Sequence, residues 1–225
     1  QEEFTDTKEL FYKIFNQQTP YKTEMLNIKK IKSYISVKEK VATGGGAFLF
    51  NNGAKKILLQ MPHCKFDKYT CNIGMKLFLE NDYKGASFST THRYTTQYSD
   101  LAHTRYSKFT AQAWAFAKSF KNGILVQLHG FGKDLDTDII ISSGDKKISK
   151  KASTIAQCFK KNGFDTKLYG KEIYTLGGTT NSSNRVLKSL DHDGFIHIEL
   201  SLQQRKSLLK SKKRRGEFSK CINIF

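Results

Sequence analysis

The stretch from Gly123 to Gly132, with the sequence GILVQLHGFG, decides the fold of this chain. Five residues with strand character run directly into His129, and two glycines follow the histidine closely. An apolar run that is stopped by glycine is typical of a strand covered on both faces. In α/β proteins, ligands and reactive groups lie beyond the carboxyl ends of such strands, so His129 stands where chemistry is expected. The alternative is a histidine tucked into a turn.

Two further stretches repeat this pattern. Residues Ile57–His63 (ILLQMPH) form another apolar run that ends in histidine, and residues Gly194–Leu200 (GFIHIEL) form a third, which carries Glu199. The recurrence favours a functional site at the strand ends over a single histidine in a turn.

The composition indicates a folded core and a strongly basic surface. Of the 225 residues, 38% are hydrophobic and 17 are Phe, which argues against global disorder. The net charge of +18 favours anionic partners such as nucleic acid, acidic glycans, anionic lipid or substrate carboxylates. The lysines are spread along the chain, however, and this is more typical of a solvated surface than of a nucleic-acid-binding stripe. No segment approaches the ~18 uninterrupted apolar residues that a membrane-spanning helix needs.

The ends and the cysteines bear on the compartment. The sequence starts at Gln1 without methionine, so we expect an upstream piece, either a removed export signal or another boundary. The four cysteines allow two disulfides in an oxidising compartment, and they lack the paired CxxC spacing of a structural zinc site. A secreted or periplasmic location is therefore preferred over a cytoplasmic one. In an exported chain we expect Cys64 and Cys71, which bracket Asp67, to form a disulfide.

Predicted strands alternate with predicted helices along the chain. We therefore expect an α/β fold with a mixed, largely parallel sheet and helices on both faces. Residues 1–43 are expected to form an N-terminal helical appendage packed on the core, with a helix over Thr5–Gln18. Residues 44–225 are expected to form a single α/β catalytic domain.

Two local patterns predict finer detail. Residues Ala47–Phe50 and Lys55–Gln60 are joined by Asn51-Asn52-Gly53, and an Asn-Gly pair supplies the positive φ angles of a tight turn, so a β-hairpin is expected. The last residues, Cys221–Phe225, are interpreted as an edge strand or a loose tail.

His63 and His129 both lie at the carboxyl ends of predicted strands, so the fold can bring them together across 66 positions. If the two histidines bind a metal ion, Asp67, in the turn after His63, is placed to be a third ligand of that ion. Two imidazoles, one carboxylate and an open position make the shell of a catalytic zinc ion. Zinc in such a shell lowers the pKa of a bound water and polarises a scissile carbonyl.

Two further residues are candidates for catalysis. Glu199 lies in an otherwise apolar strand, where an unpaired carboxylate is costly to bury, and a general base is its natural role. The alternative is an ion pair with a lysine or with Arg205. Arg93 follows another predicted strand and is expected to bind a substrate carboxylate or to stabilise an oxyanion. The alternative there is an ion pair with Asp100.

The remaining histidines have lesser expected roles. His92 and His103 are spare candidates for the metal shell. His197 shares a strand face with Glu199 and is expected to contact the site residues without binding the metal itself. His192, between two aspartates, is interpreted as part of a solvated turn.

The three motifs together resemble a known superfamily. The segments Met61–Asp67, Gln127–Gly130 and His197–Leu200 are similar to those of the zinc carboxypeptidase superfamily, and within it to the N-formylglutamate amidohydrolases and phage poly-γ-glutamate hydrolases. The resemblance covers roughly residues 45 to 205. It implies a mixed α/β sheet, one zinc held by His63, Asp67 and His129, and Glu199 as general base. The carboxypeptidase His-x-x-Glu pattern is replaced here by His63-x-x-x-Asp67.

We therefore expect a zinc-dependent hydrolase that cleaves an amide or peptide bond. The expected substrate is small and acidic, such as a cell-wall peptide, poly-glutamate or an N-acyl amino acid, which the basic surface would attract. Two other classes stay open. One is a non-catalytic basic protein that binds an anionic polymer, and the other is a metal-dependent nuclease or phosphoesterase, for which nucleic acid would be the partner.

Overall fold

The computed structural model describes residues 2–21, 23–40, 44–133 and 135–225. Within these ranges nine strands form one sheet: β1 (Leu26–Ile31), β2 (Tyr34–Glu39), β3 (Ala47–Asn51), β4 (Lys55–Met61), β5 (Tyr83–Phe88), β6 (Ile124–Gly130), β7 (Ile139–Ser142), β8 (Thr166–Leu168) and β9 (Phe195–Leu200). Seven helices accompany them: α1 (Glu2–Phe15), α2 (Thr70–Glu80), α3 (Lys108–Ser119), α4 (Lys150–Lys161), α5 (Ser182–Lys188), α6 (Leu202–Lys210) and α7 (Lys212–Ile222).

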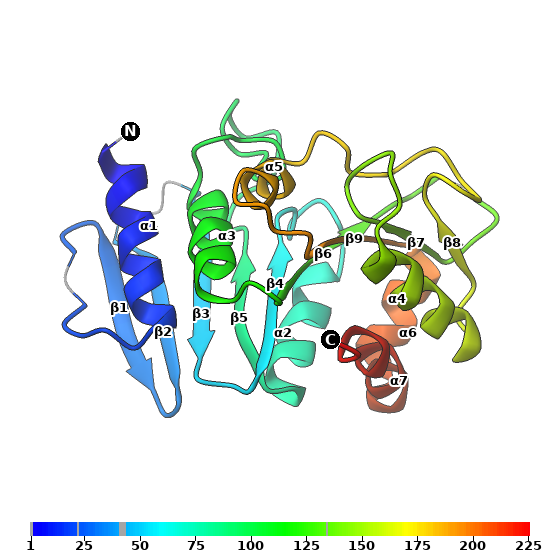
Figure 1. Ribbon diagram of the computed structural model, residues 1–225, viewed down its shortest axis with the longest axis horizontal. Helices are drawn as coiled ribbons and strands as arrows, with labels where there is room; N and C mark the ends of the chain where they lie inside the picture. The colour runs from blue at the N-terminus through cyan, green and yellow to red at the C-terminus, as the bar shows by residue number, and fades with distance from the viewer. Residues whose placement is uncertain (1, 22, 41–43, 134) are drawn as a thin grey trace.

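The sheet is mixed, and its parallel part lies at the centre. The strand order is β1-β2-β3-β5-β4-β6-β9-β7-β8, which Figure 1 shows from left to right. Strands β5, β4, β6 and β9 pair in parallel, as do β7 and β8, whereas β1–β2, β2–β3, β3–β5 and β7–β9 are antiparallel. The expected mixed α/β fold is confirmed. Parallel pairing is found at the centre of the sheet and at the β7–β8 edge, and the other pairings are antiparallel.

Strand β6 occupies the position that its sequence predicts. All its residues from Ile124 to His129 are buried, because β4 and β9 flank it and helices cover both faces of the sheet. Alternate side chains of neighbouring β4 show how the two faces divide. Leu58 belongs to a cluster with residues of α1, α3 and α5, and Ile57 and Leu59 belong to a cluster with α2, α4, α6 and α7.

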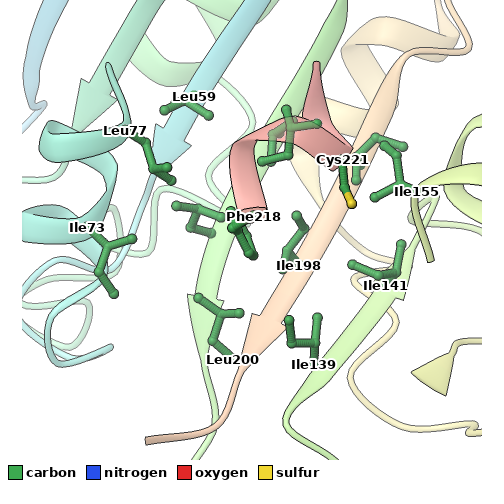
Figure 2. Packing of buried hydrophobic residues seen from close by; sticks show 14 of the residues in the cluster. Leu59, Ile73, Leu77, Ile139, Ile141, Ile155, Ile198, Leu200, Phe218 and Cys221 are labelled. Carbon is green, nitrogen blue, oxygen red and sulfur yellow. The ribbon is translucent and has the colours of Figure 1, made fainter. Parts of the chain in front are cut away.

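The cluster that contains Ile57 and Leu59 packs against one face of strands β4, β6, β7 and β9. In Figure 2, Phe218 of α7 lies over Ile198 of β9, between Leu77 of α2 and Ile155 of α4. Full burial of one such aromatic side chain stabilises a fold by roughly 1.5–3 kcal/mol. The helices of this face are therefore held by the same strands that carry the candidate site.

The expected hairpin between β3 and β4 is wrong, because β5 lies between these two strands. The loop between β3 and β4 instead forms hydrogen bonds with Asp82, the residue just before β5. The Asp82 carboxylate accepts hydrogen bonds from Asn51 Nδ2 (3.2 Å) and from the Ala54 amide (2.7 Å). A Cβ at Gly53 would lie 2.5 Å from the Asp82 carbonyl oxygen, so this glycine is needed for close approach rather than for a hairpin turn.

The N-terminal segment is less helical than its sequence indicates. Helix α1 is present, but residues 26–31 and 34–39 form the antiparallel pair β1–β2, which extends the sheet through β3. In Figure 1, α1 lies over this part of the sheet. The expected boundary between residues 43 and 44 adjoins residues 41–43, which are outside the described residues.

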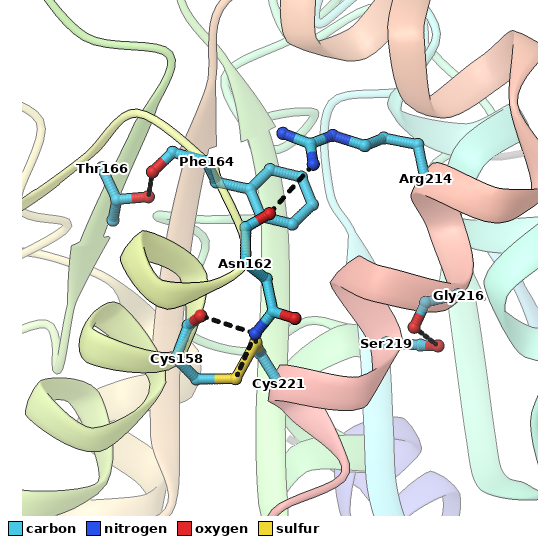
Figure 3. Close-up of a disulfide and its surroundings, with 8 residues drawn as sticks. All are labelled: Cys158, Asn162, Phe164, Thr166, Arg214, Gly216, Ser219 and Cys221. Atoms are coloured by element: carbon cyan, nitrogen blue, oxygen red, sulfur yellow. Dashed lines mark hydrogen bonds between the residues drawn. A yellow bond between two sulfur atoms is a disulfide. The ribbon is translucent and has the colours of Figure 1, made fainter.

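The expected edge strand or loose tail at residues 221–225 is wrong, because helix α7 continues to Ile222. A disulfide joins Cys221 to Cys158 of α4, with a Cα–Cα distance of 5.5 Å. Figure 3 shows Arg214 reaching from α7 to the carbonyl of Asn162, whose side chain bonds the Cys158 carbonyl. The second disulfide is the predicted Cys64–Cys71 pair. None of the helices in the described part of the chain combines the length and apolarity needed to span a bilayer.

Candidate metal centre

The candidate site lies at the carboxyl edge of the parallel strands. His63 follows the end of β4, His129 is the penultimate residue of β6, and Glu199 is the penultimate residue of β9. Because β6 is parallel to both neighbours, these strand ends meet at one edge of the sheet. His129 is in direct register with Glu199.

The structure brings His63, Asp67 and His129 together. Asp67 Oδ2 lies 3.4 Å from His63 Nδ1 and 3.4 Å from His129 Nδ1, and all three side chains are buried. The turn that carries Asp67 is short and closed by the hydrogen bond from the Asp67 amide to the His63 carbonyl (2.7 Å). One ligand atom from each residue falls within 4.8 Å of the others.

The donor set fits a metal ion. Asp67 Oδ2 is buried and has no hydrogen-bond donor, although two imidazole nitrogens face it. Burying an unpaired carboxylate oxygen is costly, and a cation between the three atoms removes the cost. Two imidazole nitrogens and one carboxylate oxygen, with a position left open, are a ligand set that catalytic zinc sites use.

The second nitrogen of His63 is held by a carboxylate. His63 Nε2 donates to Asp100 Oδ1 at 2.8 Å, which leaves Nδ1 facing Asp67. The other oxygen of Asp100 pairs with Arg93 and, at 3.0 Å, with His103 Nδ1. A carboxylate behind a ligating histidine fixes its ring and makes it a stronger ligand. The sequence pointed to Asp100 only as a partner of Arg93.

The protonation states of His129 and Asp67 suit metal binding, whereas at His63 a proton competes with the metal. Burial lowers the pKa of the His129 imidazole to about 4, and the nearby His197 adds to this effect, so His129 is neutral at pH 7. Burial alone would raise the pKa of Asp67, but His129 and His63 outweigh it and keep that pKa below its usual range. His63 is also buried, yet Asp100 and Asp67 raise its pKa above the ordinary value.

Glu199 has a histidine rather than a lysine as its partner. Its Oε1 lies 3.3 Å from His197 Nε2, and the His197 ring packs on His129 with 4.5 Å between ring centroids. Arg205, the alternative partner, instead donates to the backbone carbonyls of Lys68 and Phe131, both at 2.8 Å. Among the described residues no lysine or arginine pairs with Glu199, whose carboxylate is buried next to His63, Asp67 and His129, which are called the metal group below.

Arg205 has a structural task next to the site. It joins the turn that carries Asp67 to the loop after β6, because Lys68 and Phe131 belong to those two segments. A Cβ at Gly130 would lie 2.5 Å from the guanidinium carbon. The glycine that follows His129 in the sequence therefore makes room for this arginine.

Arg93 pairs with Asp100, which is the alternative that its sequence offered, and it also lies beside His63. It forms the ion pair with Asp100, and its Nη1 is 3.5 Å from His63 Nδ1, at the edge of the metal group. The rings of Phe66 and Tyr94 stack against the guanidinium at 5.3 and 5.2 Å. Arg93 is thus pre-positioned beside the site, with partly exposed aromatic rings around it.

His92, His103 and His192 do not belong to the metal group. His103 reaches the site only through Asp100, and His92 packs on Phe66 and Tyr94 outside the metal group. The expectation for His192 is wrong: this residue is buried, and its Nε2 donates to the Phe120 carbonyl at 3.0 Å. It lies before β9, at the end of that strand away from Glu199.

The mixed sheet, with two histidines and a carboxylate gathered at its carboxyl edge, has a carboxypeptidase-like fold. The chain belongs to the poly-gamma-glutamate hydrolase family, whose pattern it matches over residues 54–223. It is accordingly a hydrolase, and the resemblance to the zinc carboxypeptidase superfamily is confirmed.

Solved structures share the fold. A bacteriophage poly-gamma-glutamate hydrolase is 13% identical, with a TM-score of 0.52 over 82% of this chain and 89% of the other. The succinylglutamate desuccinylase of Chromobacterium violaceum is 8% identical, with a TM-score of 0.54 over 95% and 72%. A metallo-carboxypeptidase of Burkholderia cenocepacia is 9% identical, with a TM-score of 0.51 over 87% and 65%. Comparison with curated protein sequences gave no match.

Proposed function

We propose that this chain is a zinc-dependent amidohydrolase that cleaves an amide or peptide bond in a small acidic substrate. The observation that carries the proposal is the convergence of His63 Nδ1 and His129 Nδ1 on Asp67 Oδ2, a buried carboxylate oxygen that has no hydrogen-bond donor. Zinc bound there would act as a Lewis acid on the scissile carbonyl and make an attacking water more acidic.

Glu199 is proposed as the general base. It is buried beside His129, and no lysine or arginine among the described residues pairs with it. Its carboxylate would accept a proton from the attacking water and deliver it to the leaving nitrogen. Both events need one carboxylate that reaches the water first and the nitrogen afterwards, and register with His129 supports this placement.

Arg93 is proposed to orient the substrate. A guanidinium can hold a carboxylate or a developing oxyanion through two parallel hydrogen bonds. In the structure its charge is shared with Asp100, so a substrate group would compete with, or add to, that ion pair. The aromatic rings of Phe66 and Tyr94 limit its movement.

The substrate class follows from charge and family together. The net charge of +18 favours carboxylate-rich material, and the family is described by its action on poly-gamma-glutamate. Poly-glutamate, an N-acyl amino acid and a cell-wall peptide all offer an amide next to carboxylates. We propose that the enzyme acts on one of these.

Two further proposals concern the chain as a whole. We propose that the protein works in an oxidising compartment, secreted or periplasmic, and the pairing of all four cysteines supports this. We also propose that residues 44–225 are the catalytic domain and residues 1–43 an accessory segment. The start of the family match at residue 54 supports this division.

Metal analysis and turnover test the proposal together. Protein purified without chelator should contain about one zinc per chain, and His63→Ala and His129→Ala should each abolish most of it. His92→Ala is the matched control, because His92 lies outside the metal group. The zinc-loaded protein should release amines from poly-γ-glutamate or N-acyl glutamates. Unchanged zinc in both variants would remove the site, and turnover confined to phosphodiesters would favour a nuclease.

A further inference from the structure

A hydrogen-bonded network of buried side-chain amides lies next to His129 of the metal group. Gln60 of β4 and Gln127 of β6 are in register on adjacent strands, and both are fully buried. Asn181 and Ser183 at the start of α5 reach the same place. Polar side chains in the middle of two core strands are costly unless all of them are hydrogen-bonded, so their arrangement calls for a reason.

The backbone carbonyl of Phe109 fixes the orientation of the Gln60 amide, which is the member of the network farthest from His129. The Phe109 carbonyl can only accept, so it must face the amide nitrogen of Gln60, which donates to it at 3.0 Å. Gln60 Oε1 therefore faces the other way, where it accepts from Gln127 Nε2 at 2.9 Å and from Ser183 Oγ at 3.0 Å. Every bond in this half of the network has one donor and one acceptor.

Asn181 is a second anchor, and it fixes the orientation of the Gln127 amide. Asn181 caps α5, and its Oδ1 accepts from the amides of Ser183 and Asn184. Its Nδ2 is therefore free to donate, and it does so to Gln127 Oε1 at 2.7 Å. Two independent backbone contacts thus require that Gln127 presents its oxygen, not its nitrogen, to His129.

The polarity of Gln127 decides the tautomer of His129. His129 Nε2 lies 3.0 Å from Gln127 Oε1, an atom that can only accept. The competing acceptor, Asp67 Oδ2, is 3.4 Å from Nδ1 and forms no hydrogen bond, so the geometry places the proton on Nε2. The lone pair of the neutral ring is then on Nδ1, which points at Asp67 Oδ2. The opposite tautomer would set a lone pair against the Gln127 oxygen and an N–H in the place of the metal.

We infer that Gln60 and Gln127 are positioning residues that set the tautomer and the orientation of His129 for metal binding. They act on His129 as Asp100 acts on His63, but through neutral amides whose direction is fixed at the Phe109 carbonyl and at the α5 cap. A neutral relay places no second negative charge beside Glu199, which is close to the same ring. The inference rests on the proposed metal site, yet the tautomer belongs to the metal-free protein.

Nitrogen chemical shifts of the histidine rings test this inference. Metal-free protein labelled with ¹⁵N-histidine is examined by long-range ¹H–¹⁵N correlation at pH 7, with the His129 signals assigned from His129→Ala. We expect protonated Nε2 and unprotonated Nδ1 in the wild type. In Gln127→Met, which removes the acceptor at similar volume, we expect a mixture of tautomers and zinc affinity lowered by about 10–100-fold.

Gln112→Met is the matched control. Gln112 is also fully buried, but neither polar atom of its side chain has a hydrogen-bond partner. This variant should keep both the tautomer and the zinc affinity. If Gln127→Met fails to fold, Gln60→Met is used instead. It removes the acceptor of Gln127 Nε2 and leaves the Gln127 amide held by Asn181, so it should lower zinc affinity in the same direction but by less.

Three results would overturn the inference. They are an Nδ1–H tautomer in the wild type, an unchanged His129 tautomer in a folded Gln127→Met protein, and equal loss of zinc affinity in Gln112→Met. The proposed function fails separately, because absence of amide hydrolysis by zinc-loaded protein leaves the tautomer result intact.

Discussion

His129 and Glu199 lie directly opposite each other on the parallel strands β6 and β9. Side chains that are in register on neighbouring strands emerge on the same face, so the Glu199 carboxylate and the His129 imidazole are presented to the same space. The proposed base and the proposed metal ligand are therefore held by the sheet itself rather than by mobile loops.

Glu199→Gln is the sharpest test of this arrangement. The amide keeps the shape of the carboxylate but cannot accept the proton, so we expect kcat to fall by ~10²–10⁴ with KM little changed. Zinc content and the circular dichroism spectrum should match the wild type. Full hydrolytic activity would remove Glu199 from the mechanism, and an unfolded variant would instead mark it as half of a structural ion pair with His197.

The two disulfides should differ in their contribution to stability. Cys64–Cys71 closes a loop with a separation of 7 residues and Cys158–Cys221 one of 63, and the longer loop restricts the unfolded chain more. Loop entropy gives about 2.5 and about 4 kcal/mol respectively. Denaturant unfolding of the two double Cys→Ala variants measures the difference. Zinc affinity should drop only when the Cys64–Cys71 pair, which encloses Asp67, is removed; the opposite order in either measurement would contradict this account.

The ion pair between Glu80 and Arg215 should make stability depend on pH. Arg215 contacts both carboxylate oxygens of Glu80, at 2.5 and 2.8 Å, and this hydrogen-bonded pairing lowers the pKa of Glu80 from its ordinary 4.5. A lowered folded-state pKa means that the stabilisation is complete above about pH 4.5 and is lost as the pH falls through the folded-state value.

Glu80→Gln should therefore cost on the order of 1–3 kcal/mol at pH 7, because it leaves the buried Arg215 without its carboxylate. The difference from the wild type should shrink as the pH is lowered below 4.5. Asp145→Asn, which breaks the exposed pair with Lys188, is the control and should cost less than about 1 kcal/mol. A pH-independent difference for Glu80→Gln would show that the ion pair is not its cause.

Gly53→Ala should destabilise the sheet. The new methyl group would press on the carbonyl and carboxylate of Asp82, at 2.5 and 2.6 Å, which costs roughly 1–3 kcal/mol for overpacking. Gly216→Ala is a control of opposite sign, since this residue lies inside α7 with no atom within 4 Å of the added carbon. That change should stabilise by up to about 1 kcal/mol. Thermal unfolding of both variants distinguishes the two effects.

Sequence patterns predicted what depends on near neighbours in the chain. The apolar runs that end at His63 and His129 fix both strands and the strand-end position of the histidines, because burial on two faces requires an apolar run. Asp67 follows from its distance to His63 within one turn. The class of fold follows from alternating strands and helices, and it is confirmed.

What depends on distant partners could not be read in this way. The apparent hairpin at Asn52 fails because β5, about 30 residues later, takes the place beside β3. Gln127 looks like an interruption of an apolar strand until Gln60 is placed next to it. His192 looks solvated between two charges, although the fold buries it against the Phe120 carbonyl.

The place of β5 has a consequence for how the chain folds. Strands β3 and β4 are connected by only three residues, 52 to 54, and a short connection forms antiparallel pairs faster than any distant strand can arrive. A β3–β4 ribbon formed in this way would have to open before β5 could take its native place between the two strands. The contact of Gly53 with Asp82 can form only after β5 is in place, so it stabilises the native strand order relative to a β3–β4 ribbon.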